Sequence, residues 1–151
     1  MEPLRCSFPQ EVAMLKPAIP LIHVTNAAAA EEFYCNRPGF RREFAHRADP
    51  AKCNPCYLGI SREGIWMHVS SFSGDGRSGG VVNFLVDSVD ALHAEFVKKG
   101  VPNAVEPVNQ TWGTREMYVK DADGNSIRFI QGWVPCRGIP KKQASGDSPG
   151  S

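Results

Sequence analysis

The predicted secondary-structure elements occur in the same order twice along the chain. The first half is predicted to contain a strand, a helix and three more strands, at residues 18–25, 27–37, 40–46, 56–60 and 65–71. The second half repeats this order at residues 81–86, 88–99, 104–107, 116–120 and 126–131. Neither half has enough strands to close a sheet alone. The sequence therefore predicts an α+β fold, in which two tandem βαβββ modules form a curled mixed sheet with a concave ligand cleft.

Capping and turn residues mark the ends of these elements. Asn26 is expected to cap the first helix, Pro38 and Gly39 to end it, and Gly100 to end the second helix. The sequence DADGN at residues 121–125 supplies residue types that accept left-handed backbone conformations. It therefore predicts a tight turn between the last two strands.

The chain length of 151 residues suits one domain. The expected organisation is an N-terminal arm, a first module, a linker rich in Gly and Ser, a second module and a flexible C-terminal tail, at residues 1–17, 18–72, 73–80, 81–134 and 135–151. The modules and linker together form the single domain at 18–134. Met1 and Met14 are both candidate starts.

The charge balance and the apolar pattern exclude several classes of protein. The 17 Lys and Arg residues against 16 Asp and Glu give a formal net charge of +1, without a basic run long enough to follow a phosphate backbone. No apolar stretch approaches membrane-spanning length, and the first residues lack the continuous apolar segment of a secretory signal. We therefore expect a cytoplasmic protein without a nucleic-acid or membrane partner.

The cysteines indicate a reducing compartment. They form an odd set without the density of a disulfide-stapled secreted domain, namely Cys6, Cys35, Cys53, Cys56 and Cys136. Cys53 and Cys56 have the C-x-x-C spacing of a redox pair or of half a zinc site. Because no second pair and no thioredoxin-like frame accompany them, we favour chance spacing in a loop.

Trp112 and Gly113 stand just ahead of the predicted final hairpin. A large flat ring beside a residue without a side chain suits a place where a planar molecule lies close to the backbone. The same two residues also suit a core ring followed by a turn glycine. Taken alone, they leave both interpretations open.

Several segments resemble one known group of proteins. The residues FY at 33–34 followed by NRPGFRREF at 36–44, and Trp112-Gly113 with the DADGN turn, resemble the bleomycin resistance proteins. These belong to the vicinal oxygen chelate superfamily, with glyoxalase I, fosfomycin resistance enzymes and extradiol dioxygenases, and the resemblance spans residues 18–131. The turn alone indicates only the fold, whereas Trp-Gly is more discriminating. The chain departs from these proteins in its near-neutral charge and in Pro38, where Leu is usual.

Enzymes of this superfamily generally bind a divalent metal through His or Glu on the first, fourth, fifth and eighth strands. The resemblance places Ile19, Met67, Val81 and Arg128 at these four positions. Three are apolar, and the permanent charge of Arg128 would repel a divalent ion. We therefore expect no metal, no other cofactor and no enzymatic activity.

Histidines offer a second possible source of metal ligands, and the chain has four, His23, His46, His68 and His93. In regular strands His23 and His68 are each one residue out of phase with the expected ligand alternation, so both are predicted to face away from the concavity. A β-bulge would reverse this. The alternative of a metal-dependent lyase, transferase or dioxygenase would use relocated ligands, of which His23, His68 and Glu116 are the best candidates.

The resemblance implies a set of ligand-binding residues, namely Trp112, Gly113, Tyr57, Ser70, Phe72, Glu43 and Glu32. The first two would line a groove for the planar bithiazole of bleomycin. The next three match pocket positions, and the two acidic residues could face the cationic parts of the drug. Ordinary strand packing for the two rings, and a solvated surface for the two acids, are the competing interpretations.

The resemblance as a whole implies metal-independent binding and sequestration of a bleomycin-family glycopeptide antibiotic, which confers resistance. A homodimer with two equivalent grooves at its interface is expected on the same ground. A metal-dependent enzyme and a binder of another aromatic or cationic small molecule are the open alternatives.

Overall fold

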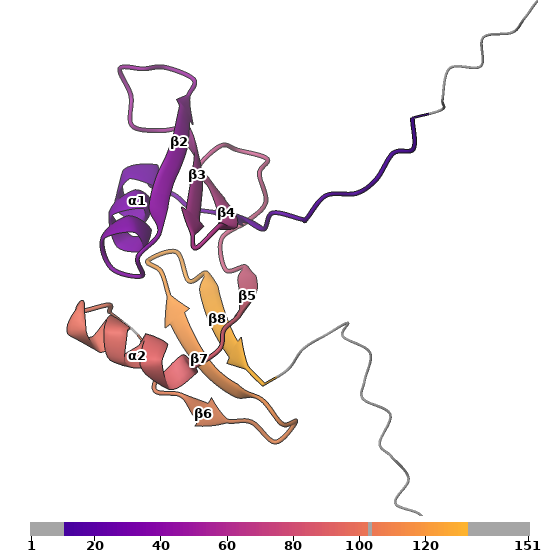
Figure 1. Cartoon of the computed structure of the whole chain (residues 1–151). Coiled ribbons are helices and arrows are strands. Elements are labelled where there is room, and N and C mark those ends of the chain that lie inside the picture. Colours follow the sequence, from indigo (N-terminus) through magenta and orange to yellow (C-terminus); the bar gives the residue numbers. More distant parts are fainter. Residues whose placement is uncertain (1–10, 103, 133–151) are drawn as a thin grey trace, which may run out of the picture.

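The structure is a computed structural model that describes residues 11–102 and 104–132, and it contains two modules with the same order of elements (Figure 1). The first comprises β1 (Leu21–His23), α1 (Ala27–Asn36), β2 (Arg41–Arg47), β3 (Cys56–Arg62) and β4 (Ile65–Ser70). The second comprises β5 (Val81–Leu85), α2 (Val89–Lys98), β6 (Val108–Asn109), β7 (Arg115–Lys120) and β8 (Ser126–Gln131). The predicted α+β fold of two βαβββ modules is confirmed. Most of the predicted arm and tail lies outside the described residues.

Each module forms a four-stranded mixed sheet. The strand orders are β1-β4-β3-β2 and β5-β8-β7-β6. In each sheet the first strand pairs in parallel with the last strand of its module, and the remaining pairs are antiparallel. The two sheets are therefore built to the same plan.

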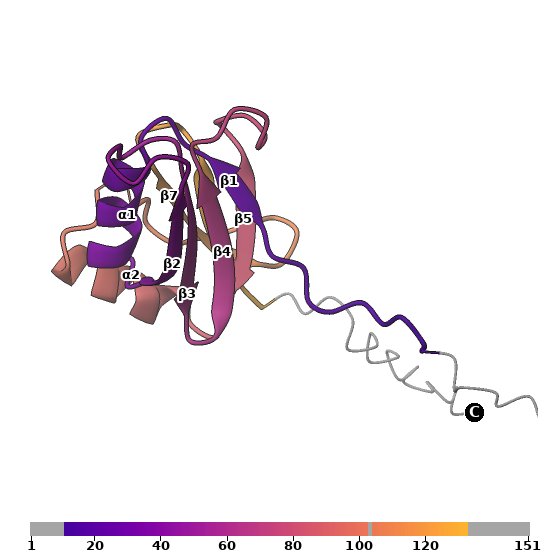
Figure 2. The ribbon, with the colours of Figure 1, turned by 90° about the horizontal axis from the view of Figure 1, so that it is seen from above.

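Both helices lie on the same side of the strands (Figure 2). Helix α1 packs on β2, β3 and β4, and α2 packs on β7 and β8. Each sheet therefore has one helix-covered face and one helix-free face. Within the described part of the chain, neither helix is long and apolar enough to cross a bilayer.

The predicted helix ends are confirmed. The Asn26 side chain accepts a hydrogen bond from the Ala29 backbone N–H at 3.1 Å, and Ser88 caps α2 in the same way. Gly100 has a φ of 67°, in the left-handed region, and the Val101 N–H donates to the Phe96 carbonyl. A C-terminal glycine therefore stops α2 as expected.

Two strands start later in the structure than the sequence predicts. The strand expected from residue 18 starts at Leu21, because Pro20 has no N–H to add to the ladder, although its carbonyl accepts from His68. The strand expected at 104–107 is β6, whose regular pairing begins only at Val108. Pro107 directly precedes it and again supplies no donor.

The two modules share one hydrophobic core. A chain of rings crosses it, with centroid separations of 6.2 Å from Tyr34 to Phe40, 5.9 Å from Phe40 to Phe84, and 6.0 Å from Phe84 to Phe129. Phe96 of α2 meets Phe129 edge-on at 5.5 Å. Because the first two rings come from the first module and the others from the second, burial of these rings holds the modules together.

The DADGN turn is a polar joint between the modules. Asn125 is fully buried, its side-chain N–H2 donates to the His23 carbonyl at 2.8 Å, and its oxygen accepts from the N–H groups of Gly79 and Gly80 at 3.0 Å. Asp121 accepts from the Tyr34 hydroxyl at 2.8 Å and from the Asn125 side chain at 2.9 Å. The turn therefore reverses the chain and also connects the second module to the first module and the linker.

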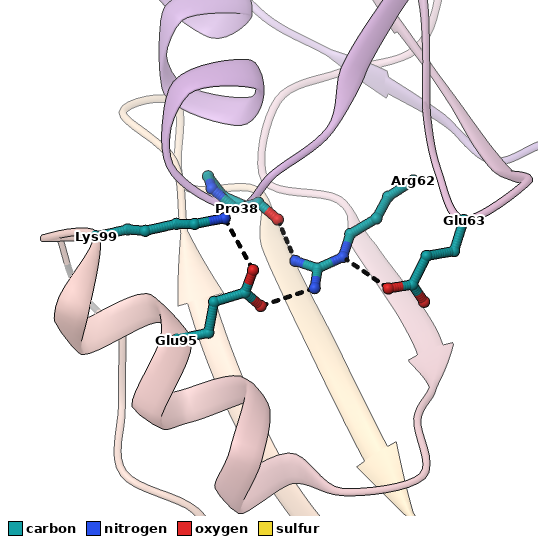
Figure 3. Close-up of polar contacts among 5 residues, drawn as sticks. All are labelled: Pro38, Arg62, Glu63, Glu95 and Lys99. Carbon is teal, nitrogen blue, oxygen red and sulfur yellow. Dashed lines mark hydrogen bonds and ion pairs between the residues drawn. The ribbon is translucent and has the colours of Figure 1, made fainter.

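A second joint lies between α2 and the end of β3 (Figure 3). Glu95 accepts from Arg62 at 2.7 Å and from Lys99 at 2.8 Å, and Arg62 also donates to the Pro38 carbonyl. Because these charges are partly exposed to water, each pair contributes at most about 1 kcal/mol to stability. The shared core and the buried turn therefore contribute more to the union of the modules.

Candidate functional site

Strand alternation decides which side chains lie on the helix-free faces. Ile22, Met67 and Val69 belong to the buried core beneath α1, and Met67 has no exposed surface. Their neighbours His23 and His68 therefore point to the helix-free face. The prediction that both histidines face away from the concavity is wrong, because the apolar alternation of β4 places Met67 against the helix.

The helix-free face of the first sheet carries four rings, which we call the first aromatic cluster: Phe44, Tyr57, Trp66 and His68. Phe44 and Tyr57 stack with centroids 6.2 Å apart and an interplanar angle of 7°. His68 meets Phe44, Tyr57 and Trp66 edge-on at 5.5, 5.2 and 6.3 Å. The Phe44 and Trp66 side chains are 41% and 36% exposed. The cluster is thus a partly exposed, mainly aromatic surface rather than part of the core.

A β-bulge builds this surface. The β2–β3 register shifts between Arg42 and Phe44, so Glu43 and Phe44 both reach the helix-free face. The Phe44 ring lies over Gly59, where an added Cβ would stand 2.1 Å from a ring atom. The glycine inside β3 therefore makes room for the ring.

His68 is neutral near pH 7, because burial lowers its pKa. Its Nδ1 shares a hydrogen bond of 2.7 Å with the hydroxyl of Tyr57. This bond fixes the relative orientation of the two rings and leaves the cluster without a charge of its own.

The remaining predicted residues of the first module have other partners. Glu43 accepts from Ser61 and Arg41, and these two contacts lower its pKa. Ser70 is buried and donates to Asp75 at 2.6 Å. Phe72 stacks on His46 at 6.2 Å. Glu32 is exposed on α1, on the helix-covered side, apart from all the others.

The helix-free face of the second sheet carries a buried carboxylate, Glu116, which is 5% exposed. It accepts hydrogen bonds from the Trp112 indole at 3.1 Å, the Thr114 hydroxyl at 2.8 Å and the Tyr118 hydroxyl at 2.6 Å. Gln110 donates to the Tyr118 oxygen at 3.2 Å. We call these five residues the Glu116 network.

The Trp112 ring is held at its polar edge and open on its faces. Its indole N–H is bonded to Glu116, yet 66% of the residue is exposed. Gly113 follows with a φ of 98°, a conformation that other residues rarely adopt. A ring of this size that is fixed but uncovered is typical of a binding surface.

The ionisation of Glu116 has a predicted pH dependence. Burial raises its pKa, but the hydrogen bonds from Tyr118, Thr114 and Trp112 and the charge of Arg128 outweigh it, and the net pKa is lowered. A carboxyl with a lowered folded-state pKa stabilises the fold above its unfolded pKa of about 4.3, and that contribution is lost as the pH falls through the folded-state value.

We therefore expect Glu116→Gln to be less stable than the parent protein by about 1–3 kcal/mol at pH 7. The difference should shrink below pH of about 4, where the parent also becomes protonated. Urea denaturation at several pH values measures it. A difference that stays constant down to pH of about 3 would contradict the assignment.

The four positions that match the superfamily metal ligands do not form a donor set. Ile19 lies ahead of β1, Met67 packs in the core, and Val81 is 52% exposed. Arg128 lies on the helix-free face, with its guanidinium carbon 5.2 Å from the centre of the Tyr118 ring. Within residues 11–102 and 104–132, no group of three or more His, Cys, Asp and Glu side chains is arranged to hold a metal ion.

Of two hollows in the described part of the chain, one lies away from the predicted groove and the other adjoins it at Gly113. One of about 990 Å³ lies between the β3–β4 turn and the β5–α2 segment, with Phe40, Ile65 and Leu92 among its walls. It contains none of the predicted ligand residues. A second, of about 360 Å³, adjoins Gln110, Gly113 and Thr114. The helix-free faces are open in one chain, so they enclose no cavity by themselves.

The C-x-x-C loop has a structural role in this chain. Cys53 and Cys56 are both free thiols, and Cys56 is buried in the core. Between them, the Asn54 side chain accepts from the Ala27 N–H and the Ser71 hydroxyl, both at 2.9 Å. The loop thereby ties the start of α1 to the end of β4.

Sequence reasoning overlooked three residues of the helix-free faces, Phe44, Trp66 and Tyr118. The alternation of β4, with Met67 and Val69 on one face, could have located Trp66. The bulge that turns Phe44 outward has no comparable signal, except for the glycine within β3.

Comparison with known proteins identifies the family. The chain matches the family described as Glyoxalase superfamily protein over residues 7–133, and it belongs to that family. A bleomycin-binding protein from the bleomycin-producing Streptomyces verticillus, complexed with copper(II)-bleomycin, superposes with a TM-score of 0.63 at 21% identity, covering 81% of this chain and all of the other. No curated protein sequence matched.

Two further structures are similar. A glyoxalase-related enzyme from Clostridium phytofermentans has a TM-score of 0.65 at 18% identity, over 80% of this chain and 98% of its own. A bleomycin resistance determinant encoded on the transposon Tn5 has a TM-score of 0.63 at 19% identity, over 80% and 100%. At such identities the likeness establishes the shared fold, and function has to be argued from the site.

Proposed function

We propose that this protein binds and sequesters a small planar molecule without chemical change and without a metal, and that a bleomycin-family antibiotic is the first candidate ligand. The observation that carries the proposal is the exposure of fixed aromatic rings on both helix-free faces, with Trp112 66% exposed on one and Phe44 41% exposed on the other. Flat rings that are fixed in advance bind planar heterocycles at low entropic cost.

The chemistry of the faces supports binding rather than catalysis by a metal. Arg128 stands at a position where superfamily enzymes carry a ligand, and its charge repels a divalent ion. Met67, which the resemblance matched to a second such position, faces the helix instead and offers no ligand to the helix-free face. His68 shares its Nδ1 with Tyr57, which leaves one ring nitrogen for any other partner. These residues do not fit a metal centre of the superfamily type.

We further propose that two chains pair so that the first aromatic cluster of one faces the Glu116 network of the other. No hydrogen bond or ring contact joins the two groups within the described part of one chain. Exposed apolar side chains rim both faces, including Leu21, Val81 and Leu85. Pairing would cover this surface and close two equivalent grooves.

Titration of bleomycin into chelator-treated protein, with sedimentation velocity on the same samples, tests these proposals. We expect a dimer that takes up one equivalent of drug per chain. A 16.6 kDa monomer that binds no drug would contradict both the pairing and the groove. A stoichiometric transition metal in the untreated protein, with turnover lost on chelation, would instead support the metal-dependent enzyme.

A further inference from the structure

Arg128 is a charged residue on the helix-free face of the second sheet that lacks an ion-pair partner within residues 11–102 and 104–132. Its Nε is buried and has no hydrogen-bond partner among the described residues. None of the ion pairs found in the described part of the chain involves it. A buried donor without a partner carries a desolvation cost, which a bound acceptor would remove.

The surroundings of Arg128 hold its guanidinium in place without neutralising it. Across the strands it pairs with Asn83 on one side and Tyr118 on the other, so these three side chains form a row on the helix-free face. Its guanidinium carbon lies 5.2 Å from the centre of the Tyr118 ring. Stacking on an aromatic ring fixes the plane of a guanidinium while leaving its N–H groups free to donate.

The nearby Glu116 carboxylate is not hydrogen-bonded to the N–H groups of Arg128. Both oxygens of Glu116 are already used, one by Trp112 and Thr114 and the other by Tyr118. Arg128 acts on it only through its charge, which helps to lower the Glu116 pKa. The face therefore offers donors and a positive charge to a ligand, and each Glu116 oxygen already accepts at least one hydrogen bond.

We infer that the ligand carries an oxygen acceptor, a carboxylate in preference to a carboxamide, attached to its flat ring system, and that Arg128 with Asn83 receives this group. The inference rests on the proposed function, since the ring is taken to lie on the aromatic surfaces already described. A planar molecule that carries a positive charge in place of this acceptor group is disfavoured, because that charge would face the guanidinium. Arg128 thus selects among planar molecules that the rings alone would accept.

Three probes share the naphthalene ring system and differ only in the attached group, so they separate the contribution of the ring from that of the group. They are 2-naphthoate, 2-naphthamide and 2-naphthylmethylammonium. In titrations followed by NMR chemical shifts, the parent protein should bind the carboxylate about 10-fold more tightly than the ammonium, with the amide between them. Arg128→Gln should reduce this preference to about 2-fold or less, and Arg128→Lys should retain part of it. Arg77→Gln, which removes an exposed arginine in the linker, should leave it unchanged.

The possible binding results distinguish a failure of the Arg128 role from a failure of the proposed binding function. If all three probes bind the parent and Arg128→Gln with the same relative affinities, the role of Arg128 is wrong and the planar-ligand site stands. If the ammonium binds the parent most tightly, the inference is also overturned. If neither the probes nor bleomycin bind the parent protein, the proposed function itself fails. The NMR spectrum of each variant shows whether it remains folded.

Discussion

Asn125→Ala should lower the free energy of unfolding by about 3–5 kcal/mol, the largest stability loss of any single substitution considered for this chain. The reason is the number of partners left behind. The Asp121 carboxylate would lose a buried hydrogen bond, and the Gly79 and Gly80 N–H groups and the His23 carbonyl would each lose a partly buried one. Urea denaturation measures the loss, and the melting temperature should fall by about 10 °C or more.

Asp123→Ala is the matched control within the same turn. Its side chain accepts from the N–H and hydroxyl of Thr25, at 3.2 and 2.8 Å, but these contacts are exposed. Water can replace them, so the expected loss is about 1 kcal/mol. Equal losses from the two substitutions would show that the buried side chain of Asn125 is not what joins the modules.

Trp112→Ala should weaken binding of the planar ligand by about 2 kcal/mol, or about 30-fold, while the fold stays intact. Since the ring is 66% exposed in the single chain, its removal leaves little buried space. Its loss would remove one of the two donors to Glu116 Oε1, and the Thr114 hydroxyl would remain as the other. Calorimetric titration with bleomycin measures the change in affinity.

Val97→Ala serves as the control for Trp112→Ala. Val97 is an apolar residue of α2 that is 62% exposed on the helix-covered side. Truncation there should leave the affinity within about 0.5 kcal/mol of the parent value. If Trp112→Ala binds the drug as tightly as Val97→Ala does, the groove does not include Trp112.

The fold could be predicted from local signals because each of them acts within a few residues. The helix cap Asn26 and the left-handed Gly100 act through their own neighbours, so the sequence is sufficient to place them. The apolar alternation of β7 and β8 likewise settles their pairing, whose register runs from Arg115 opposite Gln131 to Lys120 opposite Ser126.

The site was harder to predict because it depends on the register and on long-range contacts. A shift of one residue exchanges the two faces of a strand. The predicted phase of β4 was off by one residue, so it put His68 on the wrong face; the buried position of Met67 shows the correct phase. The bulge beside Glu43 follows from β2–β3 pairing and not from the composition of β2. Likewise, Asn125 was expected only to shape a turn, since its partners His23 and Gly79 are far away in the sequence.

The most direct test of metal-independent binding is calorimetric titration of metal-free bleomycin into the protein, with and without a chelator. We expect a dissociation constant on the order of 1 μM or below. The value should be the same in both titrations, and the drug should be recovered unchanged in mass. No heat of binding at micromolar drug, or binding that disappears with the chelator, would contradict the account.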